Sequence, residues 1–360
     1  MRIAVGLSGG VDSSVAALRL RRAGHDLFTL FLRNGVEVEA GGPVRSCCSA
    51  SDARDGRAVA ASLGVPFHAV DFSAEFRGLR SEFVDAYRSG RTPNPCVRCN
   101  RDIKFGRLYE IARSLGADAV ATGHYARLET LEGRPRLRRA ADRRKDQSYQ
   151  LFSVRRERLA RVLFPLGDLS KEEVRSIARE AGLPVAEKPE SQDVCFVPTG
   201  DYRDLLREEG VPSRPGSIVD GAGNVLGRHD GVEAFTVGQR RGLGVAGPRF
   251  VVSIHPASAT VVAGTREEAS TSRFRVVETN WIGREEPPPG AAFGAEIQVR
   301  SRHVPVPGRV EARGDGEADV ELQRPEAAVA PGQAAVFYEG DLLVGGGWIA
   351  RDPGPVRPGP

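Results

Sequence analysis

A short run of small and polar residues, Ser8-Gly9-Gly10-Val11-Asp12-Ser13-Ser14, follows the apolar segment 3–7 near the start of the chain. The run opens a helical pattern, so it predicts a strand that ends in a tight turn and continues into a helix. Backbone N–H groups in such a turn point at one spot, and the dipole of the following helix adds positive potential there. We therefore expect the turn to bind a phosphate-sized anion. The alternative is an ordinary Gly-rich turn capped by Asp12 or Ser13.

The turn lacks the lysine that follows the second glycine in GxxxxGK[ST] loops, which belong to enzymes that cleave the terminal phosphate of ATP. It instead resembles the PP-loop of the ATP pyrophosphatases. Those enzymes hold the β and γ phosphates while ATP reacts at its α-phosphate. The resemblance implies adenylation chemistry with ATP as the cosubstrate.

Cys96 and Cys99 are separated by two residues inside the segment 92–100, TPNPCVRCN, whose two prolines predict an irregular loop instead of a helix. Such thiols can chelate one metal, form a redox pair, or supply a nucleophile and its neighbour. The alternative is that both are small buried apolar residues. Cys195 lies between Val and Phe, a setting that by itself favours the core, so its role depends on the other cysteines.

The adjacent pair Cys47-Cys48 follows the second expected strand. Adjacent cysteines rarely serve one tetrahedral metal, so we expect one of them to be a ligand or sulfur carrier and the other to be a packing residue.

A basic run over residues 134–145 leads into Asp146-Gln147-Ser148-Tyr149. Its first part, 134–139, is typical of a solvated hairpin. Its second part places basic groups beside amide and aromatic side chains, which suits phosphate contacts and base recognition in a folded or single-stranded RNA loop. His124 is interpreted either as a helix-cap or core residue or as an RNA or nucleotide contact.

Strands and helices alternate along the first half of the chain, which predicts an α/β fold with a doubly wound parallel sheet. The expected strands cover 27–32, 67–72 and 119–122, and the expected helices cover 55–63 and 104–115. Ligands of such sheets bind at the carboxyl ends of the strands. Ser8 and the pair Gly123-His124 both follow strands, so we expect both to face that crevice.

Short alternating runs replace the helical period from about residue 200, which predicts two smaller β-rich domains, the last of them a β-barrel. The expected division is 1–199, 200–268 and 269–351, followed by a Pro-rich, disordered tail, 352–360. Strands of the last domain are expected at 296–299, 309–312, 318–322, 334–338 and 342–344.

Composition narrows the class of protein. The 360 residues are 40% hydrophobic and 27% charged, which is typical of a globular chain with two or three domains. A net charge of +4 permits a nucleic-acid partner without requiring one. Only four of the 51 basic residues are lysine, an excess of arginine that we ascribe to genome composition. We find no signal peptide or membrane span and expect a cytoplasmic protein whose five cysteines are catalytic or metal-binding.

Taken together, the motifs resemble those of the bacterial tRNA-specific 2-thiouridylases, the MnmA/TrmU family, and the match runs over nearly the whole chain. The resemblance implies a PP-loop domain like those of the adenine nucleotide alpha hydrolases. The motifs that carry it are Gly6 to Ser13, TPNPCVRCN at 92–100, TGHYA at 122–126, KDQSY at 145–149, SQDVCF at 191–196, TVGQRRGLG at 236–244, and PGQ at 331–333.

This resemblance implies that ATP, with Mg²⁺, adenylates the C2 oxygen of the wobble uridine in a tRNA anticodon. A sulfur atom then replaces that oxygen, giving 2-thiouridine, AMP and pyrophosphate. By the same resemblance Cys195 bears a persulfide supplied by a sulfur-donor protein, and Cys99 is the partner nucleophile that ends in a Cys99–Cys195 disulfide.

The resemblance also assigns binding residues. Those for ATP are Gly6, Leu7, Ser8, Gly9, Gly10, Val11, Asp12, Ser13, Leu32 and Gly123. Those that line the target base are Asn94, Pro95 and Cys96. Those that touch tRNA are His124, Lys145, Asp146, Gln147, Arg300, Ser301 and Gln333. The uridine must be flipped out of the anticodon stack to reach them.

Cys96 departs from the family pattern, because many members carry an aspartate there as the general acid or base. A thiol is a poor substitute for that role. Cys96, Cys99 and Cys195 would instead suffice to hold a 4Fe-4S cluster with one open iron, as in iron-sulfur tRNA thiolases, and this hypothesis stands beside the persulfide route.

Two other functions remain open. One is a PP-loop synthetase that adenylates a small metabolite and needs neither tRNA nor Cys99 and Cys195. The other is a non-catalytic, zinc-stabilised RNA-binding protein in which Cys96, Cys99 and Cys195 are joined by Cys47, Cys48 or a histidine.

Overall fold

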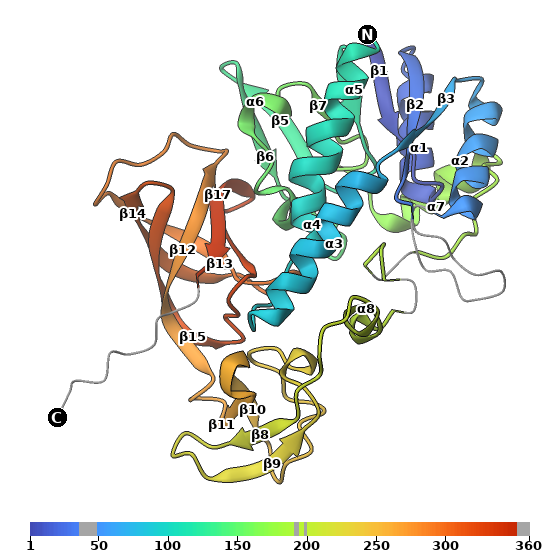
Figure 1. Ribbon diagram of the computed structural model, residues 1–360. Helices are drawn as coiled ribbons and strands as arrows, with labels where there is room; N and C mark the ends of the chain where they lie inside the picture. Colours follow the sequence, from blue (N-terminus) through green and yellow to red (C-terminus); the bar gives the residue numbers. More distant parts are fainter. Residues whose placement is uncertain (36–48, 191–193, 198–199, 351–360) are drawn as a thin grey trace. The chain divides into compact units, whose positions relative to one another are not determined.

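The computed structural model describes residues 1–35, 49–190, 194–197 and 200–350 (Figure 1). Cys47, Cys48 and the expected tail 352–360 lie outside the described residues. The chain folds into two compact units. Unit 1 is Met1–Arg80, Pro95–Tyr202 and Asp341–Val344, and unit 2 is Ser81–Asn94, Arg203–Gly340 and the chain from Gly345 onwards. The division into three domains stays a prediction.

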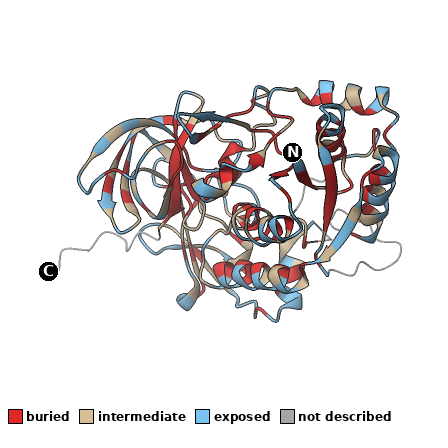
Figure 2. Ribbon diagram, turned by 90° about the horizontal axis from the view of Figure 1, so that it is seen from above, coloured by how far each residue is buried: buried red, intermediate tan, exposed pale blue. Residues whose placement is uncertain are grey.

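A five-stranded parallel sheet forms the centre of unit 1 and confirms the α/β expectation. Its strands are β1 (Arg2–Gly6), β2 (Asp26–Arg33), β3 (Phe67–Asp71), β4 (Ala119–Ala121) and β7 (Val162–Leu163). Their order is β3-β2-β1-β4-β7, and every pairing is parallel. Ile3 and Val5 of the central strand are fully buried, and Figure 2 shows buried residues concentrated along these strands.

The strand order reverses direction beside β1. The chain leaves β1 through a helix toward β2 on one side, while β4 lies on the other side of β1. In open α/β sheets such a reversal leaves a crevice at the carboxyl ends of the two strands, where ligands bind. The fold therefore places the segments that follow Gly6 and Ala121 at one crevice.

Eight helices are assigned to the described chain, two of which, α3 and α8, contain residues of both units. They are α1 (Val11–Arg22), α2 (Ala50–Leu63), α3 (Ser73–Arg88), α4 (Pro95–Arg98), α5 (Leu108–Ser114), α6 (Arg156–Leu159), α7 (Lys171–Glu180) and α8 (Tyr202–Glu208). A π-helix, η1 (Cys99–Arg107), joins α4 to α5. Three 3-10 turns are η2 (Ser148–Leu151), η3 (Val232–Ala234) and η4 (Pro256–Ser258). No described helix combines the length and hydropathy that crossing a bilayer requires.

The segment around Cys96 and Cys99 differs from the sequence prediction. We expected a loop, but α4 begins at Pro95 and continues directly into η1. Proline is tolerated in the first turn of a helix, where its missing N–H has no intrahelical partner, so Pro95 starts the helix instead of preventing it. The π-helix widens the turns after Cys99, a feature that is frequent at functional sites.

Unit 2 contains a four-stranded sheet of order β10-β11-β8-β9. Its strands are β8 (Gly216–Val219), β9 (Val225–His229), β10 (Phe250–His255) and β11 (Thr260–Gly264). Ile218, Val251, Val261 and Ala263 of these strands are fully buried and form its core.

Six antiparallel strands form a closed barrel in the C-terminal region, as the sequence predicted. They are β12 (Ser270–Trp281), β13 (Ala292–Gln298), β14 (Val306–Gly314), β15 (Glu317–Ala327), β16 (Ala334–Glu339) and β17 (Leu342–Ile349). The order is β12-β15-β14-β13-β16-β17, and pairing of β12 with β17 closes the barrel. The expected hairpin at 134–139 is present as β5 (Arg127–Leu131) and β6 (Arg134–Arg138), and β6 pairs with the start of β17.

Candidate functional site

The turn between β1 and α1 has the geometry that its sequence predicts. Gly9 has φ +72°, and a Cβ at this position would lie 2.2 Å from the carbonyl oxygen of Asp52. Gly10 is the N-cap of α1. The Ser8 N–H donates to Ser13 Oγ at 3.1 Å, and that hydroxyl donates to the Gly10 carbonyl at 3.1 Å. These bonds fold the turn over the first N–H groups of the helix, which are the groups that bind anions.

Gly123 lies directly against this turn. A Cβ on Gly123 would stand 2.6 Å from the Ser13 nitrogen and 2.7 Å from the Asp12 carbonyl carbon, so only glycine permits the approach. Gly123 follows β4, Gly6 ends β1, and Leu32 lies near the end of β2. The residues assigned to ATP thus meet at the carboxyl edge of three neighbouring strands.

Asp12 is the centre of a chain of hydrogen bonds and ion pairs. Tyr125 Oη and Lys171 Nζ both donate to Asp12 Oδ1 at 2.7 Å. Lys171 also pairs with Glu190 Oε1 at 2.9 Å, and Lys145 Nζ donates to Glu190 Oε2 at 2.7 Å. The sequence analysis assigned roles to Asp12 and Lys145 but missed Lys171 and Glu190.

Neighbouring side chains set the ionisation of Glu190 and Tyr125 in this hydrogen-bonded network. Burial alone would raise the pKa of Glu190, but hydrogen bonds from Lys145 and Lys171 bring that pKa down to about 2. Burial, together with the neighbouring Asp12 carboxylate, raises the pKa of Tyr125, which therefore stays a neutral phenol that donates to Asp12. Glu190 is therefore a carboxylate at neutral pH, bonded to both lysines.

A second lysine that the sequence analysis missed holds the other side of the turn. Lys188 Nζ donates to the Gly9 carbonyl at 3.0 Å, to Asp52 Oδ1 at 2.7 Å, and to Asp55 Oδ2. Burial opposes the charge on this lysine, but the two carboxylates raise its pKa, so it remains an ammonium. Asp52 is buried at the start of α2, where it forms a capping box with Ser49.

The segment Lys145 to Gln147 is connected to the turn through Tyr125. Gln147 Oε1 accepts the Tyr125 N–H at 3.0 Å, and the Gln147 N–H donates to the Tyr125 carbonyl at 2.8 Å. Asp146 caps the local backbone by accepting the N–H groups of Ala140 and Ser148. In the structure Asp146 and Gln147 therefore shape the segment, and the side chain of Lys145 binds Glu190.

His124 is buried between aromatic rings. Phe105 and Phe164 each lie 5.9 Å from it, measured between ring centroids. Its Nδ1 is 2.7 Å from Thr122 Oγ1, and its Nε2 is 3.4 Å from Lys104 Nζ. Burial, and to a lesser degree the charge of Lys104, hold the pKa of His124 well below 6.5, so the ring is neutral at pH 7.

The three described cysteines differ in exposure. Cys96 is exposed, Cys99 is buried, and Cys195 is intermediate. Among the described residues, which include all three, no group of three or more His, Cys, Asp or Glu side chains is placed to hold a metal ion. The ligand set that a single metal ion such as zinc would need is therefore not assembled at Cys96, Cys99 and Cys195.

The predicted tRNA-binding residues of unit 2 lie in two turns, one before β16 and one after β13. Gln333 Nε2 donates to the carbonyls of Thr92 at 3.1 Å and Pro93 at 3.0 Å, directly before the half-buried Asn94. The Thr92 N–H donates to Pro331 at 2.8 Å, which ties the same backbone to the turn before β16. Arg300 and Ser301 are exposed in the turn after β13.

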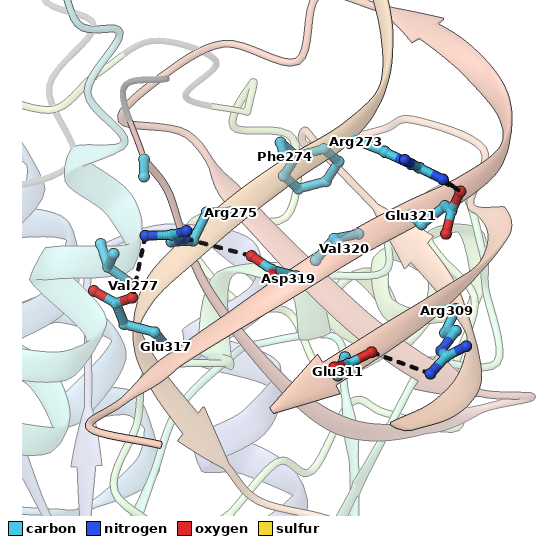
Figure 3. A pocket seen from close by; sticks show the side chains of 11 residues that line it. Arg273, Phe274, Arg275, Val277, Arg309, Glu311, Glu317, Asp319, Val320 and Glu321 are labelled. Carbon is cyan, nitrogen blue, oxygen red and sulfur yellow. Dashed lines mark hydrogen bonds and ion pairs between the residues drawn. The ribbon is translucent and has the colours of Figure 1, made fainter. Parts of the chain in front are cut away.

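A hollow on the outside of the barrel is less suited to bind an anion than the crevice of the parallel sheet (Figure 3). Its basic side chains are balanced by neighbouring carboxylates, as in the pairs Arg275–Asp319 at 3.4 Å and Arg309–Glu311 at 3.1 Å. Arg273 pairs with Glu321 in the same way. We therefore take the crevice of the parallel sheet as the candidate site.

Family models match three consecutive parts of the chain. The models are described as a tRNA methyl transferase HUP domain over residues 1–199, a tRNA methyl transferase PRC-barrel domain over 203–265, and an aminomethyltransferase beta-barrel domain over 271–349.

Curated relatives match over almost the full length. The tRNA-specific 2-thiouridylase MnmA of Chloroflexus aggregans is 49% identical, with 97% of this chain and 98% of the relative covered. The protein of the same name from Geotalea uraniireducens is 46% identical, with 97% and 94% covered. A predicted subunit of tRNA methyltransferase from Methanocaldococcus jannaschii matches in structure with a TM-score of 0.33 and 18% identity, covering 50% of this chain and 76% of that one. On the evidence of sequence identity over nearly its whole length, the chain belongs to the family of tRNA-specific 2-thiouridylases.

Proposed function

We propose that this protein is an ATP-dependent tRNA 2-thiouridylase, a sulfurtransferase that converts the anticodon wobble uridine to 2-thiouridine. The observation that carries the proposal is the meeting of the Ser8 turn with Gly123 at the reversal point of a parallel sheet. Full-length identity of 49% to a protein named for this activity supports it. The phosphate turn supplies N–H donors for ATP, and it has no lysine of its own for cleaving the terminal phosphate.

The reaction needs ATP because the C2 oxygen of uridine is a poor leaving group. In the proposed first step this oxygen attacks the α-phosphorus of ATP and pyrophosphate leaves. The terminal sulfur of a Cys195 persulfide then attacks C2, and AMP departs with the former uridine oxygen. Finally the Cys99 thiolate attacks the Cys195 sulfur, which releases 2-thiouridine and leaves a Cys99–Cys195 disulfide.

Asp12 is the residue on this turn whose chemistry suits Mg²⁺, because magnesium prefers carboxylate and phosphate oxygens. When bound, Mg²⁺ would neutralise developing charge on the phosphates. Tyr125 and Lys171 hold the Asp12 carboxylate in place by donating to its Oδ1.

For sulfur transfer we favour the persulfide route over the cluster route. The three cysteines differ in exposure, and no described group that contains them is placed to hold a single metal ion. The persulfide route needs only Cys99 and Cys195 as thiols. Cys96 then has no ligand role, and its replacement by the aspartate of other family members should be tolerated.

The remaining assignments are parts of the same proposal. Asn94, Pro95 and Cys96 line the flipped uridine, and the tRNA is held by His124, Lys145, Asp146, Gln147, Arg300, Ser301 and Gln333. A thiol reductant then returns the Cys99–Cys195 disulfide to two thiols, after which a sulfur-donor protein transfers a new persulfide sulfur to Cys195. The protein acts in the cytoplasm, and its three domains divide near residues 200 and 268.

Mass analysis of tRNA nucleosides tests the proposal. Unmodified tRNA is incubated with the intact enzyme, ATP, Mg²⁺ and a sulfur source, and 2-thiouridine is expected only when ATP is present. Cys195→Ser and Cys99→Ser should abolish the product, whereas Cys96→Asp should retain it. A methylated nucleoside in place of 2-thiouridine, or ATP turnover that is indifferent to tRNA, would contradict the assignment. Iron in active protein, lost together with activity in Cys96→Asp, would restore the cluster route.

A further inference from the structure

The few lysines of this chain all contact the candidate site. Only four of 51 basic residues are lysine, and they fall between residues 104 and 188 while arginine occurs throughout. Each contacts a residue of the site described above, the pairs being Lys104 with His124, Lys145 with Glu190, Lys171 with Asp12, and Lys188 with Gly9. An ammonium is compact and donates in three directions, whereas a guanidinium is a planar fork. Because arginine fills nearly every other basic position of this chain, we infer that these four positions require the smaller ammonium of lysine.

Lys188 and Lys171 contact the phosphate turn differently. The ammonium of Lys188 donates to three oxygens, those of Gly9, Asp52 and Asp55, so its three protons hold the turn itself. The ammonium of Lys171 donates to the carboxylates of Asp12 and Glu190. Its side chain is only 8% exposed.

The stability of α7 does not explain a lysine at position 171. Lys171 is the first residue of that helix, directly after the N-cap Ser170. The dipole of a helix disfavours a cation at its N-terminus, and burial of an ammonium is unfavourable as well. Two carboxylates offset both effects, and one of them, Asp12, belongs to the phosphate turn. The contact with Asp12 at the phosphate turn therefore explains a lysine at position 171.

A carboxylate at a phosphate turn repels an incoming polyphosphate unless a cation compensates it. Lys171 Nζ donates to that carboxylate at 2.7 Å. We propose that Lys171 binds the β and γ phosphates of ATP, supplying from α7 the ammonium that GxxxxGK[ST] loops carry within the loop. This inference rests on the proposed binding of ATP at the turn. Asp12 and Glu190 hold the ammonium until ATP enters, and a phosphate oxygen then accepts one of its protons.

Calorimetric titration with ATP and with AMP tests this inference on the full chain. For Lys171→Met we expect the affinity for ATP to fall about 10- to 100-fold, as for loss of a charge-assisted hydrogen bond. The affinity for AMP, which lacks the β and γ phosphates, should stay within about two-fold of the original. Arg179→Met is the matched control, because Arg179 is an exposed cation on the same helix that pairs with Glu187. It should change neither affinity.

The possible results separate the explanations. Equal losses for ATP and AMP, or no loss for either, would overturn the role of Lys171 while leaving ATP binding by the unaltered protein intact. Failure of the unaltered protein to bind ATP would instead overturn the proposed function. The double variant Asp12→Asn with Lys171→Met, titrated in EDTA, separates direct contact from charge compensation. If Lys171 only neutralises Asp12, that variant regains ATP affinity, whereas a direct phosphate contact predicts that the loss persists.

Discussion

Replacing Gly123 by alanine tests whether the close approach of β4 to α1 forms the ATP site. The added Cβ would lie 2.6 Å from the Ser13 nitrogen and 2.7 Å from the Asp12 carbonyl carbon, whereas ordinary contact begins at 3.4 Å. Both neighbours are backbone atoms, so a strand end or a helix N-terminus must shift by about 0.8 Å. Gly123 is not in the left-handed region of φ, so the cost arises from this contact alone.

Overpacking of this kind typically costs about 1–3 kcal/mol of stability. The shift also displaces the N–H donors that face the phosphates, so we expect kcat/KM for ATP to fall about 10- to 100-fold. Urea unfolding and tRNA-dependent pyrophosphate release measure the two effects. Gly78→Ala is the matched control, because an added Cβ there meets nothing within 4 Å. Because Gly78 lies within a helix, Gly78→Ala should raise the free energy of unfolding by about 0.5–1 kcal/mol and leave the activity of the enzyme unchanged. Equal behaviour of the two variants would refute the reasoning.

Other substitutions give distinct results. Lys188→Met leaves the buried carboxylate of Asp52 without its cation, so urea titration should show a loss of about 3 kcal/mol, and an unchanged midpoint would contradict the pairing. Because His124 is neutral when folded and has a depressed pKa, the unfolded chain binds a proton that the folded chain does not as the pH falls below 6.5. Stability should then fall by at most about 1.4 kcal/mol per pH unit, and His124→Phe should remove that slope when urea midpoints are compared between about pH 7.5 and about pH 5.5. Gln333→Leu removes two hydrogen bonds to the backbone before Asn94. Because Gln333 is proposed to hold the tRNA, we expect the affinity for tRNA to fall, and a fall in kcat with tRNA affinity unchanged would mean that Gln333 only shapes the backbone before Asn94.

Sequence patterns predicted the buried strands of both the parallel sheet and the barrel well, because a buried strand leaves a continuous apolar run. The expected strand at 27–32 falls inside β2, and the expected strand at 334–338 falls inside β16. Helix starts were harder to predict. The helix expected at 55–63 begins at Ala50, because Ser49 and Asp52 form a capping box that hydrophobic periodicity does not register. The loop predicted from the two prolines of the segment 92–100 is wrong from Pro95 onwards, because Pro95 starts a helix.

The residues of the site were predictable only where a motif carries them. The Ser8 turn and Gly123 follow strands, and the topology of the sheet brings strand ends together. Lys171 and Glu190 belong to no local pattern, because their roles arise from contacts made over long sequence separations, as between Lys171 and Asp12. The scarcity of lysine is the available signal, because all four lysines contact residues of the candidate site, whereas genome composition explains only the excess of arginine.

The central claim is that ATP activates the C2 oxygen of the wobble uridine. The most direct test uses tRNA that carries ¹⁸O at C2 of that uridine, incubated with the enzyme, ATP and a sulfur source. Mass spectrometry of the nucleotide product should find AMP heavier by one ¹⁸O atom, in an amount equal to the 2-thiouridine formed. Unlabelled AMP alongside 2-thiouridine would contradict the account, because the oxygen would then have left C2 without ever bonding to the α-phosphorus of ATP.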